Sequence, residues 1–578
     1  MAKKEQEMYE GMPVIEASDS KGLKKKLEKL ELRPEKYVVK ISNRSTKIKA
    51  GAFMECEDIA ALIIPDSVTE IGESAFEDCT GLTSIVIPES VAKIGDSAFT
   101  RCTGLTSVVI PDSVTEIGNW AFSGCTGLTS IVISEGNKVY DSRNNCNAII
   151  KTATNELIKG CGNTVIPDSV TAIGWHAFKG CTNLTSIIIP NSVTEIGNSA
   201  FEECNELSNA TISDSVTEIG ESAFKDCKAL ANIVVGNSVT VIRDSAFEGC
   251  PGLTSVTIPD SVTKIGNSAF EGCTGLTDVV ISNCVQEIGF NAFNSCSGLA
   301  SIVIPDSVTK IEDSAFYGCS GLKSIIVSDD NKNYDSRNNC NAIIETATDK
   351  LIKGCDNSII PDSVREIGDQ AFRKCAALRD IAIPGSVTAI GRNAFSSCAG
   401  LTSIVIPELV TKIQESAFRD CSGLTNVVIP DSVEVIENYA FRGCSSLTSV
   451  IIPNPAVIIA ESAFDDGTEL IVKNEGRLTL KRYVMGLQYD FEEFDKEENE
   501  GSYYTTDGTL GELFDNDQID KALGEHQKKN LDEVSEEEID DIIRDLVLNL
   551  DQGAIKFLKI SDGNKTLYED SNDKPYHD

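Results

Sequence analysis

Cysteine is the residue type in this chain whose number and spacing could support chemistry. The chain has 20 cysteines, and 15 of them follow an Ala-Phe pair by three residues, in a row from Cys56 to Cys444. Such a row could form disulfides, hold metal ions, or pack as buried free thiols, because an unpaired cysteine behaves as a small apolar side chain. No Cys-x-x-Cys pair occurs and His is nearly absent, so the sequence argues against zinc and other metals.

The disulfide alternative depends on how the cysteines would be stacked. Neighbouring strands lie about 4.8 Å apart, so equivalent cysteines on adjacent coils would be within disulfide reach. A continuous row of equivalent thiols gives no reason to pair in twos, however. We therefore expect the row to be reduced and buried.

Catalytic residues of the usual kinds are not grouped in the sequence. Asp141, Ser142 and Arg143 follow one another in a loop-like tract, but no general base is near Ser142. The three histidines occur in unrelated contexts, at His176, His526 and His577. We expect no enzymatic activity and no cofactor.

The two tryptophans are the other conspicuous residues. Trp120 and Trp175 replace the polar residues found at turn positions in the other repeats, and His176 follows the second of them. They could fill local gaps, or they could form an aromatic binding patch, because Trp contributes strongly to binding energy at interfaces. We expect His176, considered by itself, to be a surface residue and not a ligand.

These residues belong to a 23-residue repeat. Residues 65–87 are typical of it, with the sequence PDSVTEIGESAFEDCTGLTSIVI. A fixed period in the twenties predicts a solenoid in which each repeat forms one coil. Leu82, Ile85 and Ile87 match the L-x-x-L-x-L core of a leucine-rich repeat and predict a short strand. A second apolar set must also face inward, where stacked coils bury it: Val68, Ile71, Ala75, Phe76 and Cys79.

The sequence PDSVTEIGESAFEDCTGL resembles the BspA-like, or Treponema-type, leucine-rich repeat of bacterial surface proteins, over about residues 47–470. The resemblance implies an α/β-type leucine-rich repeat solenoid with 23-residue coils and a parallel sheet. It also implies a location on the cell surface or outside the cell. Several members of the family are adhesins for host proteins or other cells.

Two longer units interrupt the repeat near residues 134–166 and 328–360. Four residues of the first unit reappear 194 residues later, the length of seven 23-residue coils and one 33-residue unit: Tyr140, Arg143, Cys146 and Cys161 return as Tyr334, Arg337, Cys340 and Cys355. Each unit has a strand, turn, strand pattern. The unit could remain in the stack as a variant coil, which we favour, or its loop could project as a contact surface.

The organisation predicted is an N-terminal cap over residues 1–46, a solenoid over residues 47–476 and a small α+β domain over residues 477–578. The last segment has 27 Asp and Glu against 12 Lys and Arg, and its patterns predict a helix from residue 535 and a hairpin over residues 554–568.

Charge and hydropathy exclude several functions. The net charge of −38 argues against nucleic-acid binding, which needs clustered Lys and Arg, and disfavours an anionic membrane surface. No apolar run has the 18 or more residues of a membrane span. The N-terminus has no apolar core of a secretory signal, so the sequence as given indicates the cytoplasm, unless a leader was removed or another route is used.

A row of strand residues is the surface that we expect to bind a partner. Val86 lies between the inward Ile85 and Ile87, so strand alternation points it outward. Contiguous exposed apolar surface marks interaction sites, although β-propensity alone could also select such residues. The equivalent positions are mostly Val or Ile: Val86, Val109, Val132, Ile188, Thr211, Val234, Thr257, Val280, Val303, Ile326, Ala382, Val405, Val428 and Ile451.

The function predicted is therefore a non-enzymatic binding or adhesion scaffold for a protein or glycan partner. Two alternatives remain open. The chain could be a structural protein that assembles with itself, or the solenoid could display an effector activity in the C-terminal domain.

Overall fold

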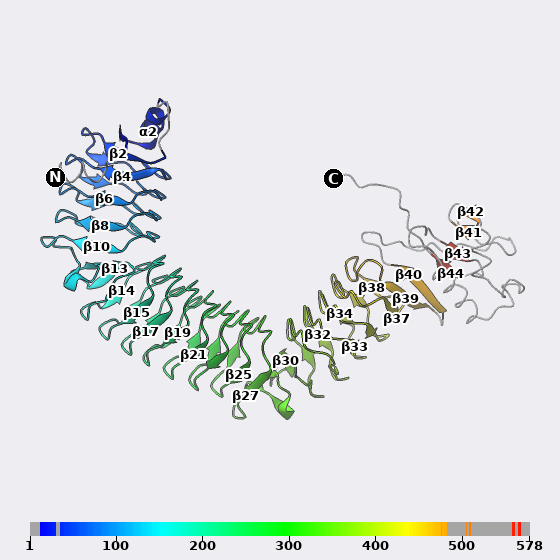
Figure 1. Ribbon diagram of the computed structural model, residues 1–578. Helices are drawn as coiled ribbons and strands as arrows, with labels where there is room; N and C mark the ends of the chain where they lie inside the picture. Colours follow the sequence, from blue (N-terminus) through cyan, green and yellow to red (C-terminus); the bar gives the residue numbers. More distant parts are fainter. Residues whose placement is uncertain are drawn as a thin grey trace, which may run out of the picture. The chain divides into compact units, whose positions relative to one another are not determined.

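The computed structural model describes residues 12–29, 35–474, 477–482, 504–505, 508–509, 558–560 and 565–567 (Figure 1). The chain divides into two compact units, Met1–Asp335 and Ser336–Asp578. Each unit is described by itself.

The first unit begins with a strand, a helix and a second strand. β1 (Val14–Ala17) pairs in parallel with β2 (Tyr37–Ile41), which pairs with the first long strand of the coils. The helix α2 (Ser20–Leu27) between them starts after Asp19, whose carboxylate accepts a hydrogen bond from the Gly22 amide at 2.7 Å. Leu23 and Leu27 are buried, so the helix packs against the start of the solenoid core.

Most regular coils contribute a long strand of three to five residues to one side of the coil, where strands of adjacent coils pair in parallel and form several sheets. The coil around Ile381 has no such strand. Equivalent residues of successive coils lie in register, as in Val86 opposite Val109. In the first unit these strands are β4 (Ile59–Ile63), β6 (Ser84–Val86), β8 (Ser107–Ile110), β10 (Ser130–Ile133), β15 (Ser186–Ile189), β17 (Asn209–Ile212), β19 (Asn232–Val234), β21 (Ser255–Thr257), β23 (Asp278–Val280), β25 (Ser301–Ile304) and β27 (Ser324–Val327). In the second they are β33 (Ser403–Val405), β35 (Asn426–Val428) and β37 (Ser449–Ile452), followed by the six-residue strand β39 (Glu469–Asn474).

The other side of each coil is a two-residue strand. In the first unit these short strands are β3 (Lys47–Ile48), β5 (Glu70–Ile71), β7 (Lys93–Ile94), β9 (Glu116–Ile117), β14 (Ala172–Ile173), β16 (Glu195–Ile196), β18 (Glu218–Ile219), β20 (Val241–Ile242), β22 (Lys264–Ile265), β24 (Glu287–Ile288) and β26 (Lys310–Ile311). In the second they are β31 (Glu366–Ile367), β32 (Ala389–Ile390), β34 (Lys412–Ile413), β36 (Val435–Ile436) and β38 (Ile458–Ile459). The predicted solenoid of 23-residue coils with a parallel sheet is confirmed; this second side consists of turns and a short strand, where other leucine-rich repeats place a helix or a 3₁₀ turn.

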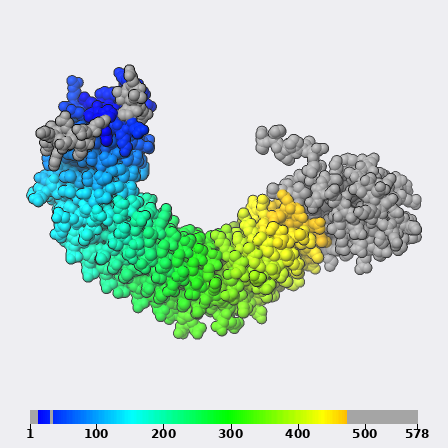
Figure 2. Space-filling view, viewed as in Figure 1, coloured from blue at the N-terminus to red at the C-terminus, as the bar shows by residue number. Residues whose placement is uncertain are grey.

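The core between the long-strand side and the short-strand side of the coils contains a column of phenylalanines. Rings on adjacent coils stack with centroids 4.9–5.6 Å apart and planes within 13° of parallel, as in Phe224 on Phe247. All of the residues that the repeat pattern assigned to the interior, from Val68 to Ile87, are buried. In the space-filling view, the side chains of successive coils close up into a continuous surface within each unit (Figure 2).

The cysteine row runs beside the phenylalanine column. From Cys79 onward, most cysteines of the row donate their thiol proton to the carbonyl of the phenylalanine 26 residues earlier, at 3.1–3.2 Å, as Cys250 does to Phe224. Burial raises the pKa of the Cys273 thiol to about 12. All the cysteines except Cys56 and Cys284 are buried and all are free, so the predicted row of buried thiols is confirmed. The thiols of the row therefore act as hydrogen-bond donors as well as small apolar groups.

The first long unit stays in the stack. β12 (Ala148–Lys151) pairs in antiparallel fashion with β11 (Tyr140–Asp141) and with β13 (Glu156–Gly160), and β13 pairs in parallel with β14 of the next coil. Gly160 stands where a regular coil has its phenylalanine, because a Cβ there would lie 2.1 Å from the ring of Phe178. The loop before β12, with the 3₁₀ turn η1 (Arg143–Asn145), is braced because the Arg143 guanidinium binds Asp141 at 2.6 Å and Asn155 at 2.8 Å.

The second long coil unit repeats this arrangement in the part that lies within the compact unit Ser336–Asp578. β29 (Ile343–Glu345) is antiparallel to β30 (Lys350–Lys353), and β30 pairs in parallel with β31. A Cβ on Gly354 would lie 2.1 Å from the ring of Phe372. The Arg337 guanidinium of η2 (Arg337–Asn339) binds Asp349 at 2.6 Å.

Beyond the last coil, β39 pairs with β40 (Arg477–Arg482), and four short strands form a separate sheet: β41 (Tyr504–Thr505), β42 (Gly508–Thr509), β43 (Leu558–Ile560) and β44 (Lys565–Leu567). β43 and β44 form an antiparallel pair within the predicted hairpin. The rest of residues 477–578, including the predicted helix from residue 535, lies outside the described residues, and the α+β domain stays a prediction. In the part of the chain that is described, no helix has both the length and the apolar character needed to cross a membrane.

Candidate functional site

The outward residues of the long strands form an exposed apolar row, which we call the valine row. Its apolar members expose 47–70% of their surface: Val86, Val109, Val132, Ile188, Val234, Val280, Val303, Ile326, Val405, Val428 and Ile451. The parallel register places each member opposite the equivalent residue of the next coil, as in Val86, Val109 and Val132. The row is therefore a set of contiguous ladders and not a scatter of single residues.

The surface beside the valine row is polar but mostly uncharged. Threonines precede many of the strands, and their hydroxyls donate to the carbonyl of the preceding coil, as Thr106 does to Thr83 at 3.1 Å. These donors are thus used within the stack. Val165 and Ile359 extend the same exposed apolar character into the long units. The sequence analysis missed these two, although each precedes an Ile-Pro pair, as Val109 does.

The outward residues of the short strands are different. Lys47 pairs with Glu70 on the next coil, and Lys93 pairs with Glu116 at 2.6 Å. Lys264 pairs with Glu287 at 3.1 Å in the same way. The hydrogen bond from Lys47 lowers the pKa of the Glu70 carboxyl. On this side of the coils, exposed ion pairs connect successive coils.

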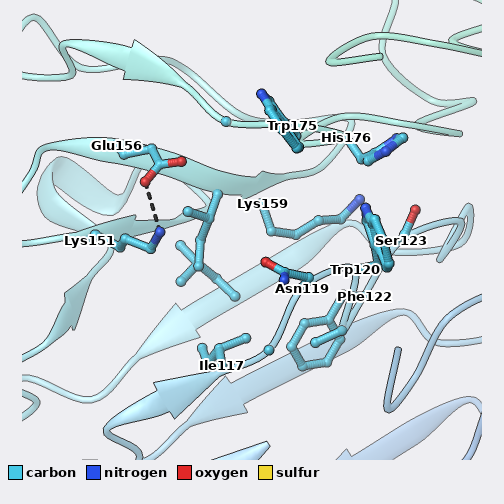
Figure 3. A pocket seen from close by; sticks show the side chains of 15 residues that line it. Ile117, Asn119, Trp120, Phe122, Ser123, Lys151, Glu156, Lys159, Trp175 and His176 are labelled. Atoms are coloured by element: carbon cyan, nitrogen blue, oxygen red, sulfur yellow. Dashed lines mark hydrogen bonds and ion pairs between the residues drawn. The ribbon is translucent and has the colours of Figure 1, made fainter. Parts of the chain in front are cut away.

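The structure brings the two tryptophans to one pocket. A cavity of about 190 Å³ lies beside the first long unit, and Trp120, Trp175 and His176 line it (Figure 3). The rings of Trp120 and His176 meet edge to face, with centroids 5.9 Å apart and an interplanar angle of 73°. Trp120 is 51% exposed and Trp175 is 65% exposed, so both indoles remain open to solvent.

Two of these side chains occupy a backbone position that disfavours them. Trp120 has φ 58° and His176 has φ 55°, in the left-handed region, where equivalent coils have small residues such as Ser97 and Ser199. Bulky residues are rare in this conformation. Trp175 likewise replaces a capping residue, since the equivalent Asp96 accepts a hydrogen bond from the Asn119 amide at 2.7 Å.

A buried lysine crosses the pocket. Lys159 extends between Trp175 and His176 on one side and Asn119 and Trp120 on the other (Figure 3). Its residue is 5% exposed, and its ammonium lies 3.9 Å from the Cys181 sulfur.

That sulfur is not a counter-ion for the ammonium, because burial raises the pKa of the Cys181 thiol to about 12. The carboxylates of this region are paired with other lysines. Glu156 binds Lys151 at 2.8 Å, and Glu202 binds Lys179 at 2.8 Å.

The imidazole of His176 completes the pocket. Its Nδ1 is buried and has no hydrogen-bond partner among the residues that the structure describes. Burial, followed by the charge of Lys179, lowers the pKa of His176, so the ring is neutral at pH 7. The pocket therefore offers one lysine without a carboxylate partner in the described part of the chain, one neutral imidazole nitrogen and two flat faces, a set suited to binding. The sequence analysis missed Lys159, although strand alternation puts it on the same inward face as Leu157.

The period, the parallel sheet and the phenylalanine column define a leucine-rich repeat protein. The sequence model of the family described as "BspA type Leucine rich repeat region (6 copies)" matches residues 46–158, 147–277, 240–350 and 350–471. The chain belongs to this family, whose repeats make it a repeat scaffold. No curated protein matches the chain.

Solved structures of bacterial leucine-rich repeat proteins are similar to this one. A leucine-rich cell surface protein from Faecalibacterium prausnitzii is 32% identical, with a TM-score of 0.50, over 58% of this chain and 92% of its own. A leucine-rich repeat protein from Bacteroides ovatus is 29% identical over 66% of this chain and 87% of its own, with a TM-score of 0.42. One from Eubacterium ventriosum is 25% identical over 53% of this chain and 88% of its own, with a TM-score of 0.44.

Proposed function

We propose that this protein is a non-enzymatic binding scaffold whose valine row receives a protein partner. The observation that carries the proposal is the in-register exposure of Val and Ile on successive coils, in a chain with a net charge of −38. Contiguous apolar surface of this kind marks interaction sites. The family assignment and the similarity to a bacterial cell surface protein support a scaffold role.

The chemistry of the row favours a protein over a glycan. A glycan needs polar donors and acceptors, and the threonine hydroxyls beside the row donate to neighbouring coils, as Thr129 does to Thr106 at 3.2 Å. A β-branched strip gains most from burying apolar side chains of a partner, at about 25 cal/mol per Å² of apolar area. The partner expected is a protein with an apolar, weakly charged surface.

The test is a pair of charge substitutions on neighbouring coils, Val280→Glu with Val303→Glu. Both residues are exposed, so the repeats should stay folded, while two carboxylates buried unpaired in an interface should weaken binding at least tenfold. The matched control is Val435→Glu with Ile458→Glu, which introduces the same charges at paired outward positions of the short strands β36 and β38.

The measurement has two stages. Proteins captured by the wild type and by the control, but not by the row variant, are identified by mass spectrometry. The dissociation constant of each purified partner is then measured for all three proteins, with circular dichroism as the check on folding. A partner that binds the row variant within twofold of the wild type would show that the row is not the site.

Self-association is tested with the same proteins. Sedimentation of the wild type at two concentrations shows whether the chain binds itself. If it does, and if the Val280→Glu, Val303→Glu variant alone becomes monomeric, a second copy of the chain occupies the row and the proposal of a different protein partner is wrong.

A further inference from the structure

We propose that the pocket of Trp120, Trp175, His176 and Lys159 binds a small organic carboxylate that carries one ring. The proposal is independent of the valine row, since the pocket lies beside the first long unit and uses different residues. Either proposal can fail without affecting the other.

The charge of the expected ligand follows from Lys159. A buried lysine is ordinarily paired with a carboxylate. Lys159 forms no ion pair within the described residues, and its nearest bonded partner is the protonated Cys181 thiol at 3.9 Å. A ligand carboxylate would provide the missing anion. Nδ1 of His176, buried and without a partner, is a second polar atom on the same pocket.

The shape of the expected ligand follows from the aromatic frame. Trp120 and Trp175 present indole rings at the cavity, and flat rings stack on such faces. The cavity of about 190 Å³ is smaller than the pockets of drug-sized ligands, so a single ring with a carboxylate is the size that suits it. Two sources offer a ring and a carboxylate: an aromatic carboxylate, whose ring is flat, and an acidic sugar, whose saturated ring packs a C–H face on tryptophan.

The second long unit provides an internal comparison. Lys353, the equivalent of Lys159, is also 5% exposed, and it lies near Cys375, whose pKa burial raises to about 11. Lysine burial is therefore a property of the long unit. The aromatic frame is not shared by the two long units. The residues 194 positions after Trp120, Trp175 and His176 are Ser314, Asp369 and Gln370. The combination of a cation and flat faces occurs at the first unit.

Intrinsic fluorescence reports on this pocket directly. The chain has two tryptophans, and both line the cavity. The full chain is titrated with phenylacetate and with N-acetylneuraminate, and with phenylacetamide as the neutral analogue. We expect a saturable change with one of the two carboxylates at a Kd of about 1 mM or lower, and binding of the neutral analogue at least about tenfold weaker, as loss of a charge-assisted hydrogen bond predicts. The acid that binds identifies the source.

Three variants distinguish the parts of the site. Lys159→Gln should weaken carboxylate binding about tenfold or more and remove the preference over the amide. Trp175→Ala, at an exposed indole, should weaken binding of both the carboxylate and the amide, and it leaves Trp120 as the fluorescent reporter. Lys353→Gln, the matched change at the second long unit, should change neither.

Two results would overturn the proposal. One is the absence of a saturable response to either carboxylate in the wild type. The other is equal affinity for phenylacetate and phenylacetamide, which shows that no cation recognises the ligand. Both are read from the wild-type protein, so the test holds even where Lys159→Gln fails to fold.

Discussion

The long-strand side and the short-strand side of each coil share a core and differ on their outer faces. Outward residues of the long strands are mostly Val or Ile, as in Val86, Val109 and Val132. Outward residues of the short strands are mostly charged, and in some stretches the charges alternate, as in the series Lys47, Glu70, Lys93 and Glu116. Both rows are strand positions with parallel partners on adjacent coils, at the same spacing of about 4.8 Å.

The difference bears on why the valine row is apolar. β-propensity favours Val and Ile at any strand position, so on its own it would select them in both rows. The short strands show that charged residues are compatible with outward positions of this solenoid, although five of the short strands have an uncharged residue there: Ala172, Val241, Ala389, Val435 and Ile458. The valine row therefore calls for a reason beyond strand propensity, and binding of a partner is the one that we propose.

The largest effect is expected where the two sheets meet, in the phenylalanine column. Phe247→Ala removes a fully buried ring that stacks on Phe224 and Phe270. A buried Phe→Ala change costs about 3–5 kcal/mol. Urea unfolding measures this loss, and hydrogen exchange should show weakened protection in both sheets of the neighbouring coils. Weakening confined to one sheet would contradict the shared core.

A smaller loss is expected from the thiol row. Cys250→Ala removes the thiol donor that lies 3.1 Å from the Phe224 carbonyl, which keeps its bond from the Cys227 amide at 3.3 Å. Loss of one hydrogen bond of this kind costs about 0.5–1.5 kcal/mol, to be measured by urea unfolding. Cys250→Ser retains a donor and should recover part of the loss. The control is Cys284→Ala at the exposed cysteine, which should be nearly neutral. If Cys250→Ala is equally neutral, the thiol hydrogen bond contributes nothing to stability.

A charge ladder can also be transferred to the valine row. Thr257 and Val280 are paired across β21 and β23, so Thr257→Glu with Val280→Lys imitates the short-strand pattern, and Thr257→Glu with Val280→Glu places like charges together. We expect the like-charged pair to be less stable by about 0.2–1 kcal/mol, from thermal unfolding at low salt. The difference should shrink at about 1 M salt, where charges are screened. Equal stability of the two double variants at low salt would mean that charges at neighbouring positions of the row do not interact.

The sequence carried most of the fold because one pattern is repeated many times. The 23-residue period located the phenylalanine column, and strand alternation located the outward residues such as Val280. Both depend on local periodicity, which the sequence states directly. The two long units could also be predicted, because their strand, turn, strand pattern depends on local sequence.

The pocket could be predicted only in part. The aromatic exceptions Trp120 and Trp175 were visible, but their meeting depends on how the first long unit inserts between two regular coils. Lys159 lies on the strand β13 of that unit and lines the pocket, next to Gly160, where the backbone passes close to the ring of Phe178. Such proximity is set by packing across coils and not by spacing along the chain.

The smallest effect is expected from a single ion pair of the short-strand ladder. Lys47→Gln removes the partner that lowers the pKa of Glu70. A carboxyl whose pKa is lowered by folding adds stability above its unfolded pKa, and this contribution is lost as the pH falls through the folded value. For an exposed pair the loss at pH 7 should be about 1 kcal/mol or less, and wild type and variant should converge at a pH below the usual glutamate range. Thermal unfolding across this pH range measures the difference, with Lys49→Gln, at an exposed lysine two residues along, as the control for loss of one positive charge. A difference that persists unchanged at acidic pH would show that Lys47 acts through packing of its side chain and not through Glu70.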